Sequence, residues 1–424
     1  MNGIAQESRI ETKEPKLIIL VLLILSIYSF FGYMLPKNMS YGLLAVSAII
    51  MIYSIILKKN VKLSTKQLIL ASLIILFIAN QLLLAPYSMF ADSSIKTAIN
   101  RSVILIIGVF ILFQGNWYKT GTKFLFIFSC THAIFTVASY LLPSFFNGVI
   151  LPIIPREVSV EIVWFMARDV YPGITNQIGR NAFYITIGIS ILYSQLVMCD
   201  WKSNKFKYAI FLLLLLALLL TGKRGHLLAN LMTMIFVSAI YAKYRNKGFF
   251  RKTIKIFFAL AFVIFGLALI FPEAAAPFMR FIARQGGDQT SGRLVLFSSA
   301  FDLFKQKPIL GWGPGVFSNL FEMGNHNVYL QLLSENGLVG FTLFVSMLLF
   351  NLSTTLRKLK FNIKNNYSLQ NNTYLFFSLY VQVFYLIYGM TGNPLNDGFI
   401  LIIYLIAASI PYTMKTKEKA ENLI

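Results

Sequence analysis

The segment from Asn325 to Gly340 holds the densest group of side chains that could carry out chemistry. Asn327, Gln331 and Glu335 recur every fourth residue, so on a helix they would form one polar stripe. His326 stands at the entry to this stripe, where an imidazole could accept the proton of a hydroxyl group. Glu335 is the alternative base. A lone histidine is more often structural, but its place beside the polar stripe favours a direct role.

The ends of this helix are also marked in the sequence. Asn325 is expected to cap the first turn, because a short polar side chain can accept a hydrogen bond from a backbone N–H there. Asn336-Gly337 is expected to end or interrupt the helix.

A second cluster, from Thr221 to His226, forms a tight turn between two apolar runs. Placing Lys223 and Arg224 together at a bilayer edge costs free energy unless an anion compensates their charge. Guanidinium groups make paired hydrogen bonds to phosphate oxygens. We therefore interpret Arg224 as a phosphate-binding residue and Lys223 as a second one, whose alternative role is to face water.

A third cation, Arg293, follows a polar, glycine-rich segment and opens a predicted amphipathic helix over 294–304. A cation in the first turn opposes the helix dipole, so helix stability does not explain it. An ion pair with Asp288 or Asp302 is the alternative. Five more arginines are expected on the same side of the membrane, where snorkelling or pairing with carboxylates is the alternative to ligand binding: Arg156, Arg168, Arg180, Arg280 and Arg284.

Motifs of several other enzyme classes are absent from the sequence. It contains no GxSxG elbow, no HExxH, no Walker A motif and no Asp-x-Asp pair of the kind that holds a divalent metal. The turn at Gly311-Trp312-Gly313-Pro314-Gly315 is tight and aromatic, but it lacks the lysine of a phosphate-binding loop. The sequence therefore predicts a reaction without metal or cofactor.

The composition indicates which elements must position these residues. The chain has 424 residues, of which 57% are hydrophobic and only 13% charged, a balance typical of a membrane protein. Its 38 Lys and Arg against 16 Asp and Glu give a net charge of +22, but apolar runs this long exclude a nucleic-acid-binding domain. Cys130 and Cys199 fall within or at the end of apolar runs, so a disulfide framework is not expected.

The apolar runs predict an all-α polytopic membrane protein with about twelve transmembrane helices and a long outer loop before the tenth. The predicted spans are 17–35, 41–57, 67–86, 100–115, 122–143, 178–198, 207–222, 226–243, 253–272, 337–356, 372–391 and 397–414.

The distribution of charge predicts the orientation of these spans. Most of the lysines and arginines fall in the loops on the side of the N-terminus, and cytoplasmic loops carry such an excess. Both termini are therefore expected in the cytoplasm. The two long connections, about 144–177 and 273–336, would lie outside. No repeat or soluble domain is visible, so residues 1–424 are expected to form a single integral membrane domain.

The last third of the chain resembles the O-antigen polymerase and ligase superfamily of bacterial envelope glycosyltransferases. The resemblance rests on the twelve-span layout and on three motifs: His326-Asn327-x-x-Leu330-Gln331-x-Leu333-x-Glu335-x-Gly337-Leu338-x-Gly340, Ser291-Gly292-Arg293, and Pro308-Ile309-Leu310-Gly311-Trp312-Gly313. The chain departs from the family at Lys223-Arg224, where many members carry Ser-Arg.

The resemblance implies transfer of an oligosaccharide from an undecaprenyl-diphosphate donor to a sugar hydroxyl at the outer face of the bacterial inner membrane. Its implied partners are these lipid-linked oligosaccharides, membrane lipids and a chain-length regulator, with no nucleic acid. Its implied site roles are catalysis by His326 or Glu335, diphosphate binding by Lys223, Arg224, Arg293 and Arg180, and acceptor-sugar binding by Asn327, Tyr329 and Gln331.

Two reactions occur in this superfamily: polymerisation of repeat units into surface polysaccharide, such as O-antigen or capsule, and ligation of finished chains to lipid A core. A bias toward Ile, Lys, Asn, Phe and Tyr fits AT-rich genomes, including capsule-bearing bacteria without lipid A, and favours a polymerase. A flippase or permease for lipid-linked sugars is the alternative from another class. It predicts cation-lined central helices, whereas the middle of most predicted spans is uncharged.

Overall fold

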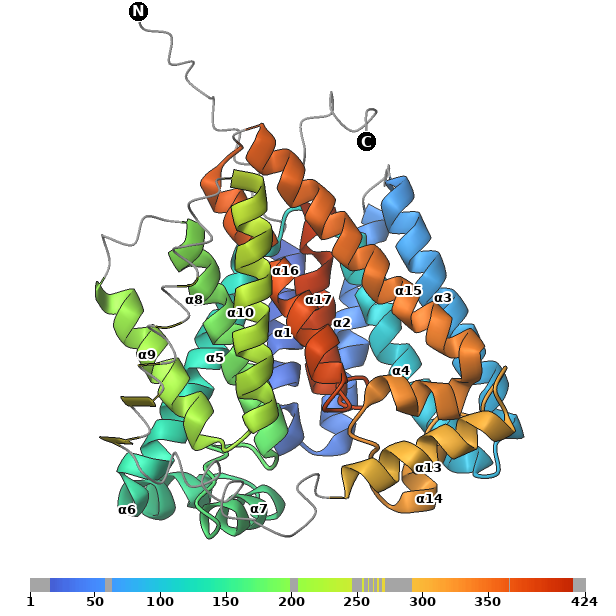
Figure 1. Cartoon of the computed structure of the whole chain (residues 1–424), viewed down its shortest axis with the longest axis horizontal. Helices are drawn as coiled ribbons and strands as arrows, with labels where there is room; N and C mark the ends of the chain where they lie inside the picture. The colour runs from blue at the N-terminus through green and yellow to red at the C-terminus, as the bar shows by residue number, and fades with distance from the viewer. Residues whose placement is uncertain are drawn as a thin grey trace, which may run out of the picture.

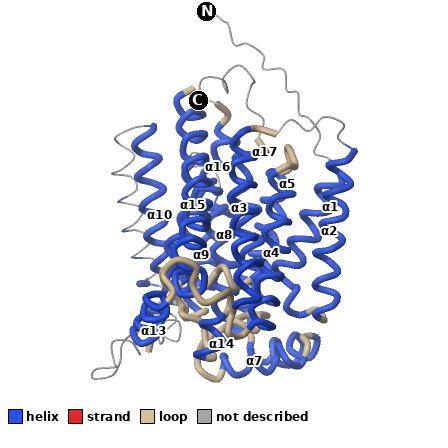
Figure 2. The backbone as a smooth tube through the Cα atoms, turned by 90° about the vertical axis from the view of Figure 1, so that its right-hand side faces the viewer, coloured by secondary structure: helices blue, strands red, loops and turns tan. Residues whose placement is uncertain are grey.

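The computed structural model of this protein describes residues 16–57, 63–198, 205–245, 292–365 and 367–414, with single helical positions between 254 and 270. Within these ranges every regular element is a helix, as Figure 2 shows. A chain crossing lipid must satisfy its backbone hydrogen bonds within the segment, and helices do so. The prediction of an all-α polytopic membrane protein is confirmed.

Among the described residues, eleven long helices form the bundle, whose arrangement Figure 1 shows. They are α1 (Lys16–Phe31), α2 (Lys37–Leu57), α3 (Thr65–Leu84), α4 (Ala91–Leu112), α5 (Tyr118–Leu141), α8 (Ile178–Met198), α9 (Lys205–Leu220), α10 (Arg224–Arg245), α15 (Val328–Lys364), α16 (Leu369–Gly389) and α17 (Gly398–Thr413).

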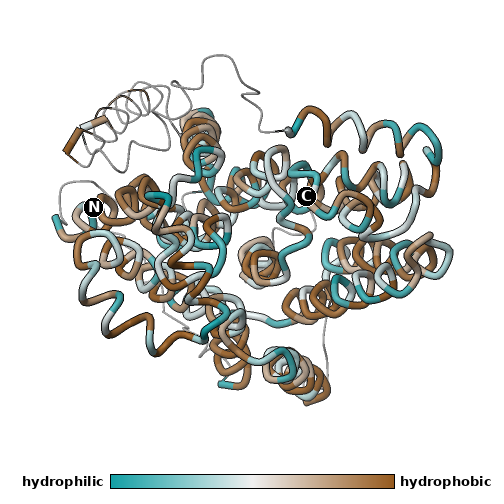
Figure 3. Tube along the Cα trace, turned by 90° about the horizontal axis from the view of Figure 1, so that it is seen from below, coloured by the Kyte–Doolittle hydropathy of each residue, from teal (hydrophilic) through white to brown (hydrophobic). Residues whose placement is uncertain are grey.

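Each predicted span coincides with one of these helices except 253–272, most of which lies outside the described residues. Among the described residues, eight helices are long and apolar enough to cross a membrane, and α17 is a shorter apolar helix. Seen along the bundle in Figure 3, hydrophobic residues run along many of the helices. The total of twelve spans remains a prediction.

The two long connections contain less irregular loop than expected, because part of each folds into helices. The first contains α6 (Pro143–Phe145), two further short helical turns and α7 (Arg156–Met166). The second contains α13 (Arg293–Gln306) and α14 (Val316–Phe321). Figure 1 shows α6, α7, α13 and α14 at one end of the bundle, which we call the site end.

The centre of the bundle lies close to α8. In the most apolar 18-residue window of α8, 94% of the residues are buried, against 28% in α2. Helix α16 packs against α8, α15 and α17, and α17 packs against α4. Residues at the first turn of α8 therefore lie in the middle of the site end.

Helix α15 begins nine residues before the predicted span 337–356 and is kinked at Gly337, where φ is +60°. Leu338 N–H donates to Pro308 O (2.8 Å) and Gly313 N–H donates to Glu335 O (2.7 Å). Residues 308–313 thus satisfy backbone groups that the kink leaves without helical partners. A side chain at either Gly311 or Gly337 would collide with this crossing backbone. The prediction that Asn336-Gly337 interrupts the helix is confirmed.

Candidate functional site

Three basic side chains from separate parts of the chain interact at the site end. Partial desolvation by the atoms around it, followed by the positive charges of Arg293 and Lys223, lowers the pKa of His326 from its ordinary value of 6.5, although the residue is exposed. Burial, followed by the charge of Arg293, likewise lowers the pKa of Lys223. We call Lys223, Arg293 and His326 the basic cluster. Three basic groups that raise one another's free energy when charged favour a bound anion.

No carboxylate neutralises this cluster in the part of the chain that the structure describes. The carboxylates of Glu335, Asp397 and Asp302 pair instead with Arg101, Arg180 and Lys305. The alternative in which Arg293 pairs with Asp302 is wrong, because the two residues stand about 13 Å apart along the axis of one helix, where Asp302 pairs with Lys305. Asp288, the other proposed partner, lies outside the described residues.

The turn between α9 and α10 places Lys223 against α8 and α16. Gly222 has φ +63°, which lets the chain reverse tightly between the two helices. A β-carbon at Gly179 would lie 3.7 Å from Lys223 Cε and 3.8 Å from the Tyr388 hydroxyl. The Lys223 side chain therefore lies beside the first turn of α8. It is half-buried, so it does not simply face water.

The other members of this turn have different surroundings. Arg224 is half-buried and is the first residue of α10. His226 is buried, and its ring centroid lies 4.2 Å from that of Tyr388. His226 therefore belongs to the aromatic core beneath the cluster.

Arg293 is the first residue of α13, as predicted, and Gly292 precedes it with φ +78°. Its side chain is half-buried and interacts electrostatically with the Tyr388 hydroxyl, as does that of Arg180. Tyr388 therefore links the basic cluster to the start of α8.

The loop before α15 holds His326 next to α13. His326 is exposed and has a left-handed backbone with φ +59°. Asn327, not Asn325, caps α15: its Oδ1 accepts from Tyr329 N–H (3.0 Å) and Leu330 N–H (3.2 Å). The buried Asn325 instead donates to Leu296 O of α13 (3.3 Å). That contact ties the histidine loop to the helix that carries Arg293.

Glu335 and Gln331 are buried and belong to a different group of hydrogen bonds. Glu335 is fully buried, pairs with Arg101 (3.2 Å) and accepts from Gln331 Nε2 (2.7 Å). Arg101 escaped the sequence analysis because its partner lies 234 positions further along the chain. An arginine at the start of the predicted span 100–115 was the available signal, since an intramembrane charge needs a partner.

The remaining predicted residues are placed as follows. Arg180 pairs with Asp397 (2.9 Å) and donates to Asn176 Oδ1 (2.9 Å). Tyr329 donates from its hydroxyl to Leu386 O (2.8 Å). The structure therefore unites Lys223, Arg293 and His326, brings Arg180 near them through Tyr388, and engages the buried Glu335 and Gln331 in hydrogen bonds with other residues.

In the described ranges, no three His, Cys, Asp or Glu side chains are grouped so that they could hold a metal ion. A reaction without metal remains an expectation from the sequence.

The fold and the cluster define a polytopic helical membrane protein with a group of basic side chains at one end. Residues 209–345 match the family model described as O-antigen ligase. The matched segment includes Lys223, Arg224, Arg293, His326 and Glu335. The match confirms the resemblance to the O-antigen ligase and polymerase superfamily. No curated protein matches the chain.

Proposed function

We propose that this protein is a glycosyltransferase that takes an oligosaccharide from an undecaprenyl-diphosphate donor and joins it to a sugar hydroxyl. The observation that carries this proposal is the basic cluster of Lys223, Arg293 and His326, which has no carboxylate partner among the described residues. A diphosphate would supply the missing negative charge. The family match to O-antigen ligase supports a lipid-linked glycan as the substrate.

In the proposed reaction, the acceptor hydroxyl oxygen attacks the anomeric carbon of the donor sugar. The bond between that carbon and the diphosphate oxygen breaks, and its electron pair leaves with the diphosphate. Arg293 and Lys223, with Arg224 and Arg180 beside them, stabilise this developing charge. The hydroxyl proton passes to His326. Because its lowered pKa keeps the imidazole neutral at pH 7, His326 can accept that proton.

The acceptor sugar is proposed to bind beside the first turns of α15, near Asn327, Tyr329 and Gln331. Asn327 is engaged as a helix cap and Gln331 is buried, so of these three Tyr329 is the most direct candidate for sugar contact. Glu335 is proposed to support the site rather than to touch the hydroxyl, because its carboxylate is already paired with Arg101.

The site end is proposed to face the outside of the bacterial inner membrane, with both termini cytoplasmic. A single cysteine placed at exposed Leu294 of α13 should react with a membrane-impermeant maleimide added to whole cells, whereas one at exposed Lys360 near the end of α15 should not. Both variants carry Cys130→Ser and Cys199→Ser. If only the Lys360→Cys variant reacts, the site end faces the cytoplasm and the proposed orientation is wrong.

The pH dependence of kcat/KM should report the electrostatics of the cluster. Because the pKa of His326 lies below 6.5, activity should fall on the acidic side only below that pH. Lys223→Met removes a positive charge, which raises the pKa of His326 and should move the acidic limb to higher pH. Lys305→Met, a matched loss of charge on α13 outside the cluster, should leave the limb in place. If Lys223→Met left the acidic limb of the kcat/KM profile in place, the proposed electrostatic effect of Lys223 on His326 would be contradicted.

We favour polymerisation of repeat units over ligation of finished chains. A polymerase must hold two lipid-diphosphate substrates, and the many arginines expected at this side of the membrane suit that task. Deleting the gene should leave single repeat units on the carrier lipid or cell surface, with long polymer missing. Full-length polymer accumulating on undecaprenyl diphosphate would favour the ligase, and repeat units trapped at the inner face would favour the flippase. A chain-length regulator is proposed as a protein partner.

A further inference from the structure

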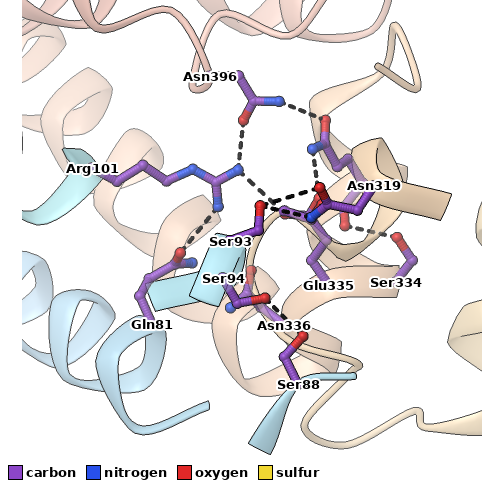
Figure 4. Close-up of polar contacts among 12 residues, drawn as sticks. Gln81, Ser88, Ser93, Ser94, Arg101, Asn319, Ser334, Glu335, Asn336 and Asn396 are labelled. Carbon is purple, nitrogen blue, oxygen red and sulfur yellow. Dashed lines mark hydrogen bonds and ion pairs between the residues drawn. The ribbon is translucent and has the colours of Figure 1, made fainter. Parts of the chain in front are cut away.

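Three buried polar side chains and the exposed Asn396 form a closed hydrogen-bonded ring (Figure 4). Arg101 donates from Nη2 to Glu335 Oε2 (3.2 Å) and to Asn396 Oδ1 (2.6 Å). Asn396 donates to Gln331 Oε1 (3.1 Å), and Gln331 donates to Glu335 Oε1 (2.7 Å). Arg101 Nη1 also donates to Gln81 Oε1 of α3 (3.0 Å). We call Arg101, Glu335, Gln331 and Asn396 the Arg101 ring.

The charges in this ring are deeply enclosed. Glu335 is 0% exposed and Arg101 is 5% exposed. Removing two charges from water is costly, and apolar residues of the same volume can often replace a buried ion pair without loss of stability. Stability alone therefore does not account for this pair. Its distinctive property is geometric, because one guanidinium group holds a carboxylate of α15 and an amide of the α16–α17 loop at the same time.

The ring reaches the basic cluster by two routes. Along α15, the ring residue Gln331 lies one turn from Asn327, the cap that follows His326. Along the α16–α17 loop, the ring residue Asn396 adjoins Asp397. Asp397 caps α17 through Oδ1 and accepts from Arg180 Nε (2.9 Å) through Oδ2.

The same part of α15 is fixed from the side of α13. The peptide oxygen of Glu335 accepts from Gly313 N–H (2.7 Å), and that of Ser334 accepts from Trp312 N–H (3.1 Å). The Trp312 indole N–H in turn donates to Leu303 O near the end of α13 (2.9 Å). A shift of Glu335 would therefore be transmitted to α13, which carries Arg293 at its other end.

We propose that the Arg101 ring is a positioning device that sets His326, Arg293 and Arg180 at their working separations. Arg101 and Glu335 act through these residues and do not touch the substrate. This inference rests on the proposed function for its catalytic consequence, but the positions themselves can be measured without it.

The structural test uses spin labels on the two sides that the ring joins. Labels at exposed Met323, before His326, and at exposed Thr391, in the α16–α17 loop, give a distance distribution by pulsed electron resonance, with both native cysteines replaced by serine. The distribution should be narrow in the parent protein and clearly broader or displaced in Glu335→Gln and in Arg101→Met. An unchanged distribution in both variants would overturn the proposal, whatever the protein catalyses.

The catalytic test separates positioning from stability. Misplacing catalytic groups by about 1 Å can cost about 100-fold in rate, so each single variant should lose about 100-fold in kcat with a much smaller change in the KM of the donor. Arg101→Lys keeps the charge but not the planar fork, and should rescue only partly. The double variant Arg101→Met with Glu335→Gln removes both charges, and should recover thermal stability without recovering kcat.

Lys358→Met is the matched control. Lys358 lies on the same helix α15 and donates to Pro411 O and Met414 O at the end of α17, far from the site end. It should leave kcat and the label distances unchanged. Parental kcat in the stable double variant would show that the ring serves stability alone. If the label distances change in the variants but the parent protein makes no glycoside, the positioning role of the ring stands and the proposed function is rejected.

Discussion

Replacing His326 by alanine is expected to abolish glycoside formation while the protein remains folded. Loss of a general base typically costs about 10²–10⁴-fold in rate. The side chain is exposed and accepts or donates no hydrogen bond to other described residues, so its removal takes away little packing. Product formation by purified protein and the thermal unfolding midpoint in detergent measure the two effects.

The backbone of His326 determines the right control. Its φ of +59° is left-handed, a conformation that asparagine tolerates better than alanine. His326→Asn therefore keeps the local backbone and removes the imidazole, and it should be as inactive as His326→Ala. Near-full activity in His326→Asn would show that another group accepts the hydroxyl proton or that the reaction needs no base.

Replacing Arg293 by alanine is expected to lower kcat by about 10²–10³-fold, the usual cost of losing one group that stabilises developing negative charge. Arg293→Lys should recover only part of this loss, because lysine lacks the paired donors that fit a diphosphate. Arg224→Ala should behave similarly. Turnover of lipid-linked donor is the measurement.

Lys305 offers the matched comparison for Arg293. It lies on the same helix α13, is exposed, and pairs with Asp302 (3.2 Å). Lys305→Ala should leave turnover unchanged. Full activity in Arg293→Lys would mean that the site needs only positive potential, without aimed hydrogen bonds.

The residues of the basic cluster could be predicted one by one because each has a signal in its local sequence. Arg293 opposes a helix dipole, Lys223 stands at a bilayer edge beside a glycine turn, and His326 precedes a polar stripe. Their mutual approach could not be predicted, since it depends on how the α9–α10 turn, the start of α13 and the loop before α15 come together at the site end. The resemblance to O-antigen polymerases and ligases indicated only that they serve one reaction.

The helices were predictable from apolar length, but the details of their ends were not. Asn325 and Asn327 are both good capping residues, and tertiary contact decides between them: Asn325 is drawn to Leu296 O and leaves the cap to Asn327. The kink at Gly337 was marked by its glycine. The role of residues 308–313 in supporting this kink could not be predicted, because it depends on where Gly311 packs.

Glu335 illustrates the limit of motif reasoning most clearly. Its place on the polar stripe made it a rival base, and its spacing to Gln331 was predicted correctly, because the two are hydrogen-bonded (2.7 Å). Its ion pair with Arg101 arises from the packing of α4 near α15 and has no local signature. A charge whose partner is distant in sequence can be suspected from one chain, but its partner cannot be named.

The central claim is that this protein joins lipid-linked oligosaccharides with release of a lipid diphosphate. Purified protein should therefore be incubated with undecaprenyl-diphosphate-linked repeat units, and the products separated on a gel beside those of His326→Asn. We expect a ladder with one rung per added repeat unit and free undecaprenyl diphosphate, both absent with the variant. Unchanged single repeat units with the folded parent protein, or a ladder that His326→Asn also produces, would contradict it.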